Sequence, residues 1–173
     1  MNNGGEIMKR QKNIIKKEDV KGELRGAIDY NGKFIEGVFV SSMGQVLKKI
    51  DNDNFEICRC YLNKPGKSND WKKGYYKVRV NNSLYNLHWL LARAFVPGYE
   101  IGLCVDHINN DSTDNRIENL QWISRGENTK KFWESLNDRE LAAYKKKYSE
   151  AIKAAHARGR YTNHLNKLHN KGE

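Results

Sequence analysis

The sequence predicts a mixed α+β protein made of a small N-terminal antiparallel β module, a central strand–loop–strand–helix segment and a basic helical arm. Short segments with apolar residues at every second position dominate before residue 80, which is typical of half-buried strands. Apolar residues at helical spacing dominate afterwards. The chain has 173 residues, enough for one domain with appendages. We expect a basic arm at 1–25, a β module at 26–70, a central domain at 71–135 and a helical arm at 136–173.

Composition argues for a folded chain in a reducing compartment. Hydrophobic residues make up 38% and aromatic residues 10% of the sequence, which disfavours disorder. No segment approaches the roughly 18–20 apolar residues of a membrane span, and Met1–Glu6 lacks the apolar run of a secretion signal. The 3 cysteines are too few for a disulfide scaffold. We therefore expect a cytoplasmic protein with no membrane partner.

Positive charge points to a polyanionic partner and is concentrated at the C-terminus. The chain has 31 Lys and Arg against 21 Asp and Glu, a formal charge of +10. Residues 145–173 hold 8 basic and 2 acidic residues, a net of +6, whereas residues 71–124 hold 6 and 5, a net of +1. Such a distribution favours a core followed by a nucleic-acid-binding tail. Charge alone leaves open a ribosomal protein, a regulator, an RNA binder, a nuclease or a solvated surface.

Strands are predicted throughout the first half of the chain. Residues 34–40 and 45–50 form two strands around a turn at Ser41–Gly44, with Gly44 in a positive-φ conformation. Phe55–Leu62 alternates with period 2 and predicts one strand, which places Cys58 and Cys60 on one face. This Cys-x-Cys pair lacks the spacing of a zinc site, so we interpret both cysteines as structural.

A strand and a helix are predicted next. Asn63–Asp70 is a polar loop, Gly74–Val80 a strand and Asn81–Ser83 a turn. A helix is predicted over residues 84–95, ended by Pro97-Gly98.

The most informative segment follows this helix. Residues 103–107 predict a strand, and residues 109–118 are rich in Asn, Asp, Ser and Thr, which favour turns. Residues 120–123 predict a second strand. Ser124 and Glu127 form a capping box, so a helix should begin near Arg125.

Asp106 and His107 end the first of these strands, and together they suit phosphodiester hydrolysis. Neighbouring side chains on a strand point to opposite faces, so one can bind a metal while the other faces a nucleophile. A carboxylate is a hard ligand for a divalent cation, and a neutral imidazole can take a proton from water. Hydrolysis of a phosphodiester needs both functions.

These residues resemble the HNH (ββα-metal) endonucleases, in particular phage intron-encoded or free-standing homing endonucleases with an Asp-His, Asn, Asn motif. The resemblance rests on Val105-Asp106-His107, Asn115, Asn119-Leu120-Gln121-Trp122-Ile123 and Asn128. Upstream, residues 87–97, 74–80 and 38–46 are similar to the helix, the strand and the small β module that precede this motif. The resemblance covers roughly residues 37–133 and implies a central ββα-metal fold.

The resemblance implies a role for four of the motif residues. His107 matches the general base that activates water, and Asp106 and Asn128 match the metal ligands. Asn119 matches the middle position of the catalytic motif, which steadies the loop and the base. The implied cofactor is one Mg²⁺, or Mn²⁺, per active site, and the hard oxygen ligands make zinc a poorer match. His88 also matches a family position, but its apolar neighbours favour a packed, hydrogen-bonded core histidine, and Trp122 is assigned to the core.

The C-terminal arm is predicted to bind DNA. Asn137 and Glu140 form a second capping box, and apolar residues from Leu141 to Ala155 repeat at helical spacing up to a stop at Gly159. A polar segment, 161–166, follows. The DNA-binding candidates are all basic: Arg93, Arg116, Arg125, Lys130, Lys131, Lys145, Lys146, Lys147, Lys153, Arg158 and Arg160.

The sequence thus predicts a metal-dependent DNA endonuclease of the HNH homing type that acts on double-stranded DNA. The resemblance implies a phage gene, and the expected location is then the cytoplasm of a bacterial host. One such site cuts one strand, so a monomer or weak dimer would nick. The alternatives are an HNH restriction or packaging-associated nuclease, and a catalytically silent DNA-binding regulator with the same fold. An RNA-binding protein is a third alternative, although no single-strand stacking module is recognisable.

Overall fold

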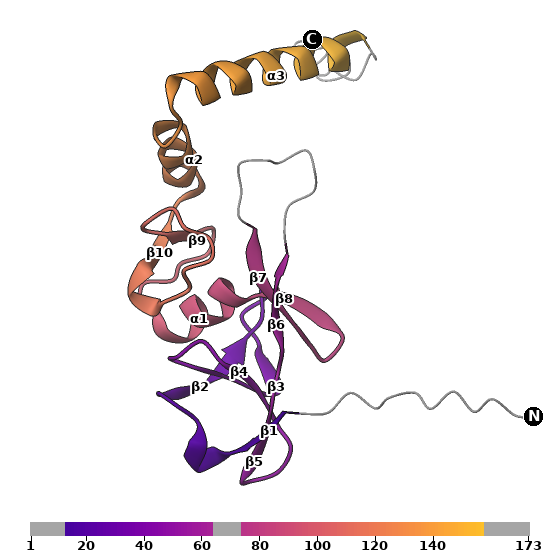
Figure 1. The fold of residues 1–173 in the computed structure, drawn as a ribbon, viewed down its shortest axis with the longest axis vertical. Coiled ribbons are helices and arrows are strands. Elements are labelled where there is room, and N and C mark those ends of the chain that lie inside the picture. The colour runs from indigo at the N-terminus through magenta and orange to yellow at the C-terminus, as the bar shows by residue number, and fades with distance from the viewer. Residues whose placement is uncertain (1–12, 64–73, 158–173) are drawn as a thin grey trace, which may run out of the picture. The chain divides into compact units, whose positions relative to one another are not determined.

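The computed structural model describes residues 13–63 and 74–157, and it confirms the mixed α+β class (Figure 1). An antiparallel sheet of five strands, in the order β1-β5-β4-β3-β2, forms the N-terminal part. Its strands are β1 (Ile14–Lys16), β2 (Leu24–Ile28), β3 (Phe34–Ser41), β4 (Val46–Lys49) and β5 (Asn54–Ile57). Between β3 and β4, Gly44 has a φ of 82°, so the predicted hairpin turn is confirmed.

The N-terminal sheet begins earlier than the sequence predicts. A basic arm is expected up to residue 25, but Ile14 and Ile15 pair with β5, and Leu24 pairs with Ser41 of β3. Ile15 and Leu24 are half-buried, whereas Ile14 is 54% exposed, so the backbone pairing and only part of the apolar side chains hold this segment in the sheet. Residues 1–12 of the expected arm lie outside the described residues.

A second antiparallel sheet has the order β6-β7-β8. It contains β6 (Cys60–Asn63), β7 (Tyr75–Val80) and β8 (Ser83–Asn86). The prediction of one strand over Phe55–Leu62 is wrong, because this segment contains two strands that pair with different sheets. β5 pairs with β4, and the last hydrogen bond there runs from the Cys58 amide to the Val46 oxygen at 2.8 Å. β6 then pairs with β7. Alternation of apolar residues continues through this exchange, so the pattern does not reveal it. Beyond Asn63, the predicted polar loop lies outside the described residues.

The β7–β8 hairpin also shortens the predicted helix. Asn81 and Asn82 have φ values of 46° and 64°, the two successive positive angles of a type I′ turn, whose twist suits a two-residue hairpin. Ser83–Asn86 therefore pairs with β7, and the helix predicted from residue 84 begins at Leu87. It ends at Phe95, before Pro97 as predicted.

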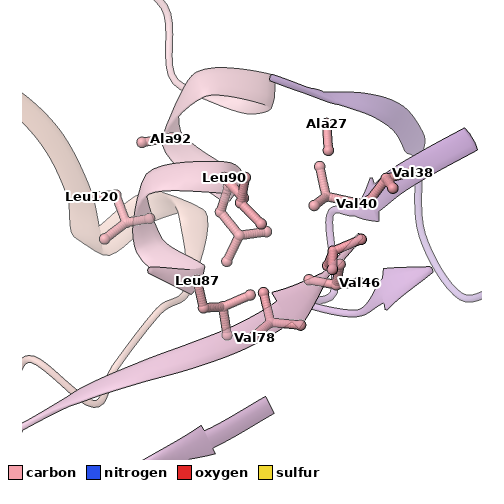
Figure 2. Close-up of a cluster of buried hydrophobic side chains, with 11 residues drawn as sticks. Ala27, Val38, Val40, Val46, Val78, Leu87, Leu90, Ala92 and Leu120 are labelled. Atoms are coloured by element: carbon pink, nitrogen blue, oxygen red, sulfur yellow. The ribbon is translucent and has the colours of Figure 1, made fainter. Parts of the chain in front are cut away.

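Helix α1 (Leu87–Phe95) is the centre of the hydrophobic core. It contacts β2 and β3 of the first sheet, β7 and β8 of the second, and also β9 and β10. Leu90 and Leu91 are completely buried, and Figure 2 shows Leu87 and Leu90 directed at the valines of the strands. Each fully buried leucine contributes about 2 kcal/mol through the hydrophobic effect. The helix consequently joins both sheets to the segment that follows.

The predicted strand–loop–strand–helix segment is present. Strands β9 (Cys104–His107) and β10 (Leu120–Ile123) form an antiparallel pair, and α2 (Arg125–Glu134) follows. By internal contacts the chain divides into two compact units, one ending at Arg125 and one starting at Gly126. None of the helices in the described ranges is long and apolar enough to cross a membrane.

The second unit contains all of α2 after Arg125, and α3 (Asp138–Ala157). The predicted capping box is confirmed: the Asn137 amide donates to Glu140 Oε2, and the Glu140 amide donates to Asn137 Oδ1, each at 3.0 Å. The ring of Tyr144 packs on Phe132 and Trp133, with centroids 5.5 and 5.0 Å away. Further along the predicted apolar stripe, Tyr148 is 61% exposed. Gly159 lies outside the described residues.

Candidate active site

Asp106 and His107 occupy the end of β9 and are both buried, with exposed fractions of 8% and 6%. The antiparallel register places Gln121 opposite Asp106 and Leu120 opposite His107. A buried polar side chain needs hydrogen-bond partners to offset its loss of water. The neighbours of these two residues therefore determine how each is oriented.

Gln121 holds the carboxylate of Asp106. Its Nε2 donates to Asp106 Oδ2 at 2.7 Å across the strand pair. Tyr75, on β7, interacts electrostatically with this carboxylate. Burial raises the pKa of the Tyr75 hydroxyl, and the negative charge of Asp106 raises it further. Tyr75 thus remains a neutral phenol that lies within electrostatic reach of Asp106.

The imidazole of His107 packs against two other rings. The His88 ring from α1 lies 5.2 Å away, centroid to centroid, at an interplanar angle of 72°. The Tyr75 ring lies 6.2 Å away at 33°. Asn115 Oδ1 lies 3.3 Å from His107 Nε2. The imidazole is therefore surrounded by α1, by β7 and by the loop that follows β9.

His88 is buried, as the sequence predicts, but it is not a fully hydrogen-bonded core histidine. It is 8% exposed, and its Nδ1 has no hydrogen-bond partner among the described residues. Burial, with a further contribution from His107, lowers the pKa of His88 to about 3. The neighbour of His107 is therefore a neutral ring at physiological pH.

The loop between β9 and β10 is closed by Asn119, which belongs to the 3₁₀ turn Ile117–Asn119. Its Oδ1 accepts from the Asn109 amide at 3.1 Å, and its Nδ2 donates to Asn109 Oδ1 at 3.0 Å and to the Asp114 oxygen at 2.8 Å. Asn119 is 6% exposed. These contacts connect both ends of the loop that begins directly after His107.

Other side chains of the loop satisfy its backbone, as predicted from its Asn, Asp and Thr content. Asp111 Oδ1 accepts from both the amide and the hydroxyl of Thr113, at 3.0 and 2.6 Å. The guanidinium of Arg116 donates twice to the carboxylate of Asp114 and lowers the pKa of that carboxyl to about 2. Ser112 donates to the Gly74 oxygen at 2.6 Å, which attaches the loop to the residue before β7.

The remaining motif residue and most of the basic candidates belong to other elements. Asn128 lies half-buried on α2, in the second unit. Arg93 places its guanidinium carbon 3.7 Å from the centroid of Tyr99, and Arg116 contacts Asp114. The other described candidates lie on α2 (Arg125, Lys130, Lys131) and on α3 (Lys145, Lys146, Lys147, Lys153). Arg158 and Arg160 lie outside the described residues.

Sequence reasoning did not assign a role to three residues that contact the central pair: Tyr75, Asn115 and Gln121. The pairing of two consecutive predicted strands could have identified Gln121, since an antiparallel register sets a partner opposite Asp106. Tyr75 could not be found in this way, because it approaches His107 through tertiary packing rather than strand pairing.

The donor set suits a hard divalent cation. Within the described ranges, no group of three or more His, Cys, Asp or Glu residues could hold a metal ion. Mg²⁺ does not need such a group, since it keeps several waters and is usually bound through one or two carboxylates together with substrate phosphates. A buried carboxylate with one oxygen held by Gln121 fits this requirement.

Comparisons with known proteins agree with this geometry. Residues 85–130 match a family model described as HNH endonuclease. The "DNA endonuclease I-HmuI" of Bacillus phage SP01 is 33% identical over 58 residues, which are 31% of this chain and 33% of that protein. The chain thus aligns with about a third of that relative's length. A solved structure, titled "DNA binding and cleavage by the HNH homing endonuclease I-HmuI", superposes with a TM-score of 0.52 and 22% identity, over 79% of this chain and 68% of the other. The overall fold is thus that of an HNH homing endonuclease.

Proposed function

We propose that this chain, which carries an HNH endonuclease domain at residues 85–130, is a DNA endonuclease that hydrolyses phosphodiester bonds in double-stranded DNA. The observation that carries the proposal is the buried Asp106–His107 pair at the end of β9. Gln121 holds the carboxylate, and the rings of His88 and Tyr75 pack on the imidazole. Pre-organisation of this kind is typical of catalytic groups.

His107 is the proposed general base. Its imidazole takes a proton from a water molecule, whose oxygen forms the new bond to phosphorus while the bond from phosphorus to the leaving oxygen breaks. The leaving oxygen then takes a proton from solvent. General bases of this kind contribute about 10²–10⁴-fold to a rate. One such site acts on one strand, so a nick is the expected product.

Asp106 and Asn128 are the proposed protein ligands of one Mg²⁺ or Mn²⁺ ion. When bound, the ion supplies positive charge that stabilises the pentacoordinate phosphate and the leaving oxygen. The contribution of this chain is a carboxylate oriented by Gln121 and a neutral amide oxygen on α2. Both are oxygen donors, which Mg²⁺ and Mn²⁺ prefer.

The basic residues of α2 and α3, together with Arg158 and Arg160, are proposed to bind DNA. Lys145, Lys146 and Lys147 are exposed on α3. Cations distributed along a helix mostly contact phosphates, and the affinity that they supply falls with added salt. Arg125, Lys130, Lys131, Lys153, Arg158 and Arg160 complete this set. Arg93 and Arg116 are further candidates in the first unit, although each also holds an intramolecular contact.

A plasmid-cleavage assay tests the proposal. Supercoiled DNA carrying candidate target sites is incubated with the full chain and Mg²⁺, with and without a chelator. We expect open-circular product from the wild type only without chelator, and at least about a hundredfold less product from His107→Ala. Equal cleavage by the variant would remove His107 from the mechanism. A matched control is His156→Ala, which changes an exposed histidine on α3.

The same assay separates the alternatives. A catalytically silent regulator would bind the plasmid but leave it supercoiled with every divalent ion. A restriction or packaging-associated nuclease would cut at many sites or linearise the plasmid, whereas a homing nuclease cuts at one. The buried Asp106–His107 pair favours an enzyme over a regulator, because a DNA-binding surface alone has no need to bury both groups.

A further inference from the structure

Tyr75 is the first residue of β7, and its ring packs on both histidines of the site. The centroid of the Tyr75 ring lies 5.0 Å from that of His88 and 6.2 Å from that of His107. The residue before it is also held, because the Ser112 hydroxyl donates to the Gly74 oxygen at 2.6 Å. Two consecutive residues therefore attach the start of β7 to the candidate active site.

The hydroxyl of Tyr75 is an available hydrogen-bond donor near Asp106. Burial raises the pKa of this hydroxyl, and the negative charge of Asp106 raises it further, so the phenol keeps its proton at the pH of a cleavage reaction. The side chain is half-buried, and within residues 13–63 and 74–157 its hydroxyl makes no hydrogen bond. The site thus contains a neutral donor that the described part of the chain does not use.

The amide side chains beside Asp106 and His107 differ from Tyr75 in this respect, because they already donate within the protein. Gln121 Nε2 donates to the carboxylate of Asp106 at 2.7 Å. Asn115 Nδ2 donates to the main-chain oxygen of Thr113 at 3.3 Å. These amides hold the site together, whereas the phenol is left for a partner from outside the chain.

Hydrolysis of a phosphodiester spreads negative charge over the non-bridging oxygens of the phosphate in the transition state. A neutral donor held at that position stabilises this charge without transferring a proton. We propose that Tyr75 is a catalytic residue whose hydroxyl donates a hydrogen bond to a non-bridging oxygen of the scissile phosphate. The inference rests on the proposed function, and it adds a substrate contact that neither the general base nor the metal ligands provide.

Tyr75→Phe is the first test, because it keeps the ring against both histidines and removes only the hydroxyl. We expect its single-turnover nicking rate, at saturating DNA and with Mg²⁺, to fall about tenfold or more, the effect of one hydrogen bond to a charged group. Tyr76→Phe is the matched control, since Tyr76 packs against the hydrophobic core, and it should nick at the wild-type rate. An unchanged rate in Tyr75→Phe would overturn the inference, even if its Kd for DNA in Ca²⁺ were weaker.

A sulfur substitution separates a direct contact from a structural effect of the same variant. Once the nick made by the wild type is mapped, duplex oligonucleotides with an Rp or an Sp phosphorothioate at that position replace one non-bridging oxygen by sulfur, a weaker acceptor. We expect one diastereomer to slow the wild type more than Tyr75→Phe, because the variant has no hydrogen bond to lose. The other diastereomer should slow both proteins equally. Equal slowing of both proteins by both diastereomers would overturn the inference.

The pH dependence of the rate distinguishes a donor from a proton-transfer group. Because the phenol keeps its proton, Tyr75→Phe should lower the rate without changing the shape of the pH profile. A change of shape would assign proton transfer to Tyr75 and contradict the inference. A wild-type chain that cuts no DNA would overturn the proposed function and this inference together, whereas a wild type and a Tyr75→Phe variant that cut equally well would overturn the inference alone.

Discussion

His88 and His107 lie with ring centroids 5.2 Å apart at an angle of 72°, one carried by α1 and the other by β9. The two histidines differ in what surrounds them. His88 is enclosed by the core and has its pKa lowered to about 3. His107 lies at the end of a strand, beside a carboxylate and a polar loop. The uncharged ring of His88 thus packs against His107 and restricts the position of its imidazole.

The first prediction concerns the pH dependence of stability that His88 imposes. Its unfolded pKa is 6.5 and its folded pKa is about 3, so between these values the unfolded chain binds a proton that the folded chain does not. The stability that depends on a neutral His88 is therefore fully present above pH 6.5, and it is lost progressively as the pH falls toward 3. At pH 5 this single group should cost about 2 kcal/mol of stability.

Urea unfolding of the wild type and His88→Leu at pH 7.5 and pH 5.0 checks this expectation. Other groups titrate in both proteins, so the relevant quantity is the difference between their two losses of stability. A loss in His88→Leu as large as that in the wild type would show that His88 protonates freely in the folded chain.

The second prediction concerns Asn119. Asn119→Ala leaves the Asn109 amide and the Asp114 oxygen without their partner inside a loop that is partly buried. Loss of such contacts costs about 1–3 kcal/mol, because buried polar groups stay unsatisfied. Chemical denaturation measures it. For comparison, Asn110→Gly changes an exposed residue with a φ of 61° in the same loop and should cost little, since glycine adopts this conformation readily.

The third prediction concerns the use of metal. Gln121→Leu removes the donor that orients the carboxylate of Asp106. Such orienting partners typically contribute about 10–100-fold to metal affinity, so the Mg²⁺ concentration for half-maximal cleavage should rise at least about tenfold. Affinity for DNA, measured in Ca²⁺, should not change. Gln45→Leu, in the β3–β4 turn, is the matched glutamine control, and an equal shift in that variant would remove the specific role of Gln121.

The fourth prediction concerns the grip on DNA. Replacement of Lys145, Lys146 and Lys147 by glutamine should reduce the dependence of log Kd on log salt by about 2 to 3, if each lysine neutralises one phosphate. Fluorescence anisotropy at salt concentrations between roughly 50 and 200 mM measures this slope, because Kd should change by about tenfold or more over that range. Replacement of Lys16, Lys17 and Lys21 removes the same charge from the first unit and should have a smaller effect. The assignment of α3 fails if the two triple variants are indistinguishable.

Much of the central segment could be predicted from sequence because its signals are local. Strand β10 occupies the predicted residues 120–123, and α2 begins at the predicted Arg125. The loop between the strands is rich in side chains that bond to their own backbone, a property of residue type alone. Local chemistry therefore identified both strands and the position of Asp106 and His107 at the end of one of them.

The errors arose where a partner distant in sequence decides the structure. Phe55–Leu62 alternates like one strand, yet β5 and β6 pair with different sheets. Ser83–Asn86 belongs to a strand because the positive φ angles of Asn81 and Asn82 return the chain onto β7. Within the site, the Tyr75 ring lies 5.0 Å from that of His88 and 6.2 Å from that of His107, centroid to centroid, and these contacts depend on how β7 packs beside α1. No pattern in one segment contains that information.

The position of α1 has a consequence for how small a working fragment of this protein can be. The family match begins at residue 85, just before the helix, but the side chains that bury Leu90 and Leu91 include Val38, Val40 and Val46 of the first sheet and Val78 of the second. A fragment limited to the matched residues would expose to water the side of α1 that packs on the two sheets. It would also lose the packing of Tyr75 against His88. The residues that match the family model thus supply only part of a shared core, and we expect them to fold only together with the two sheets that precede them.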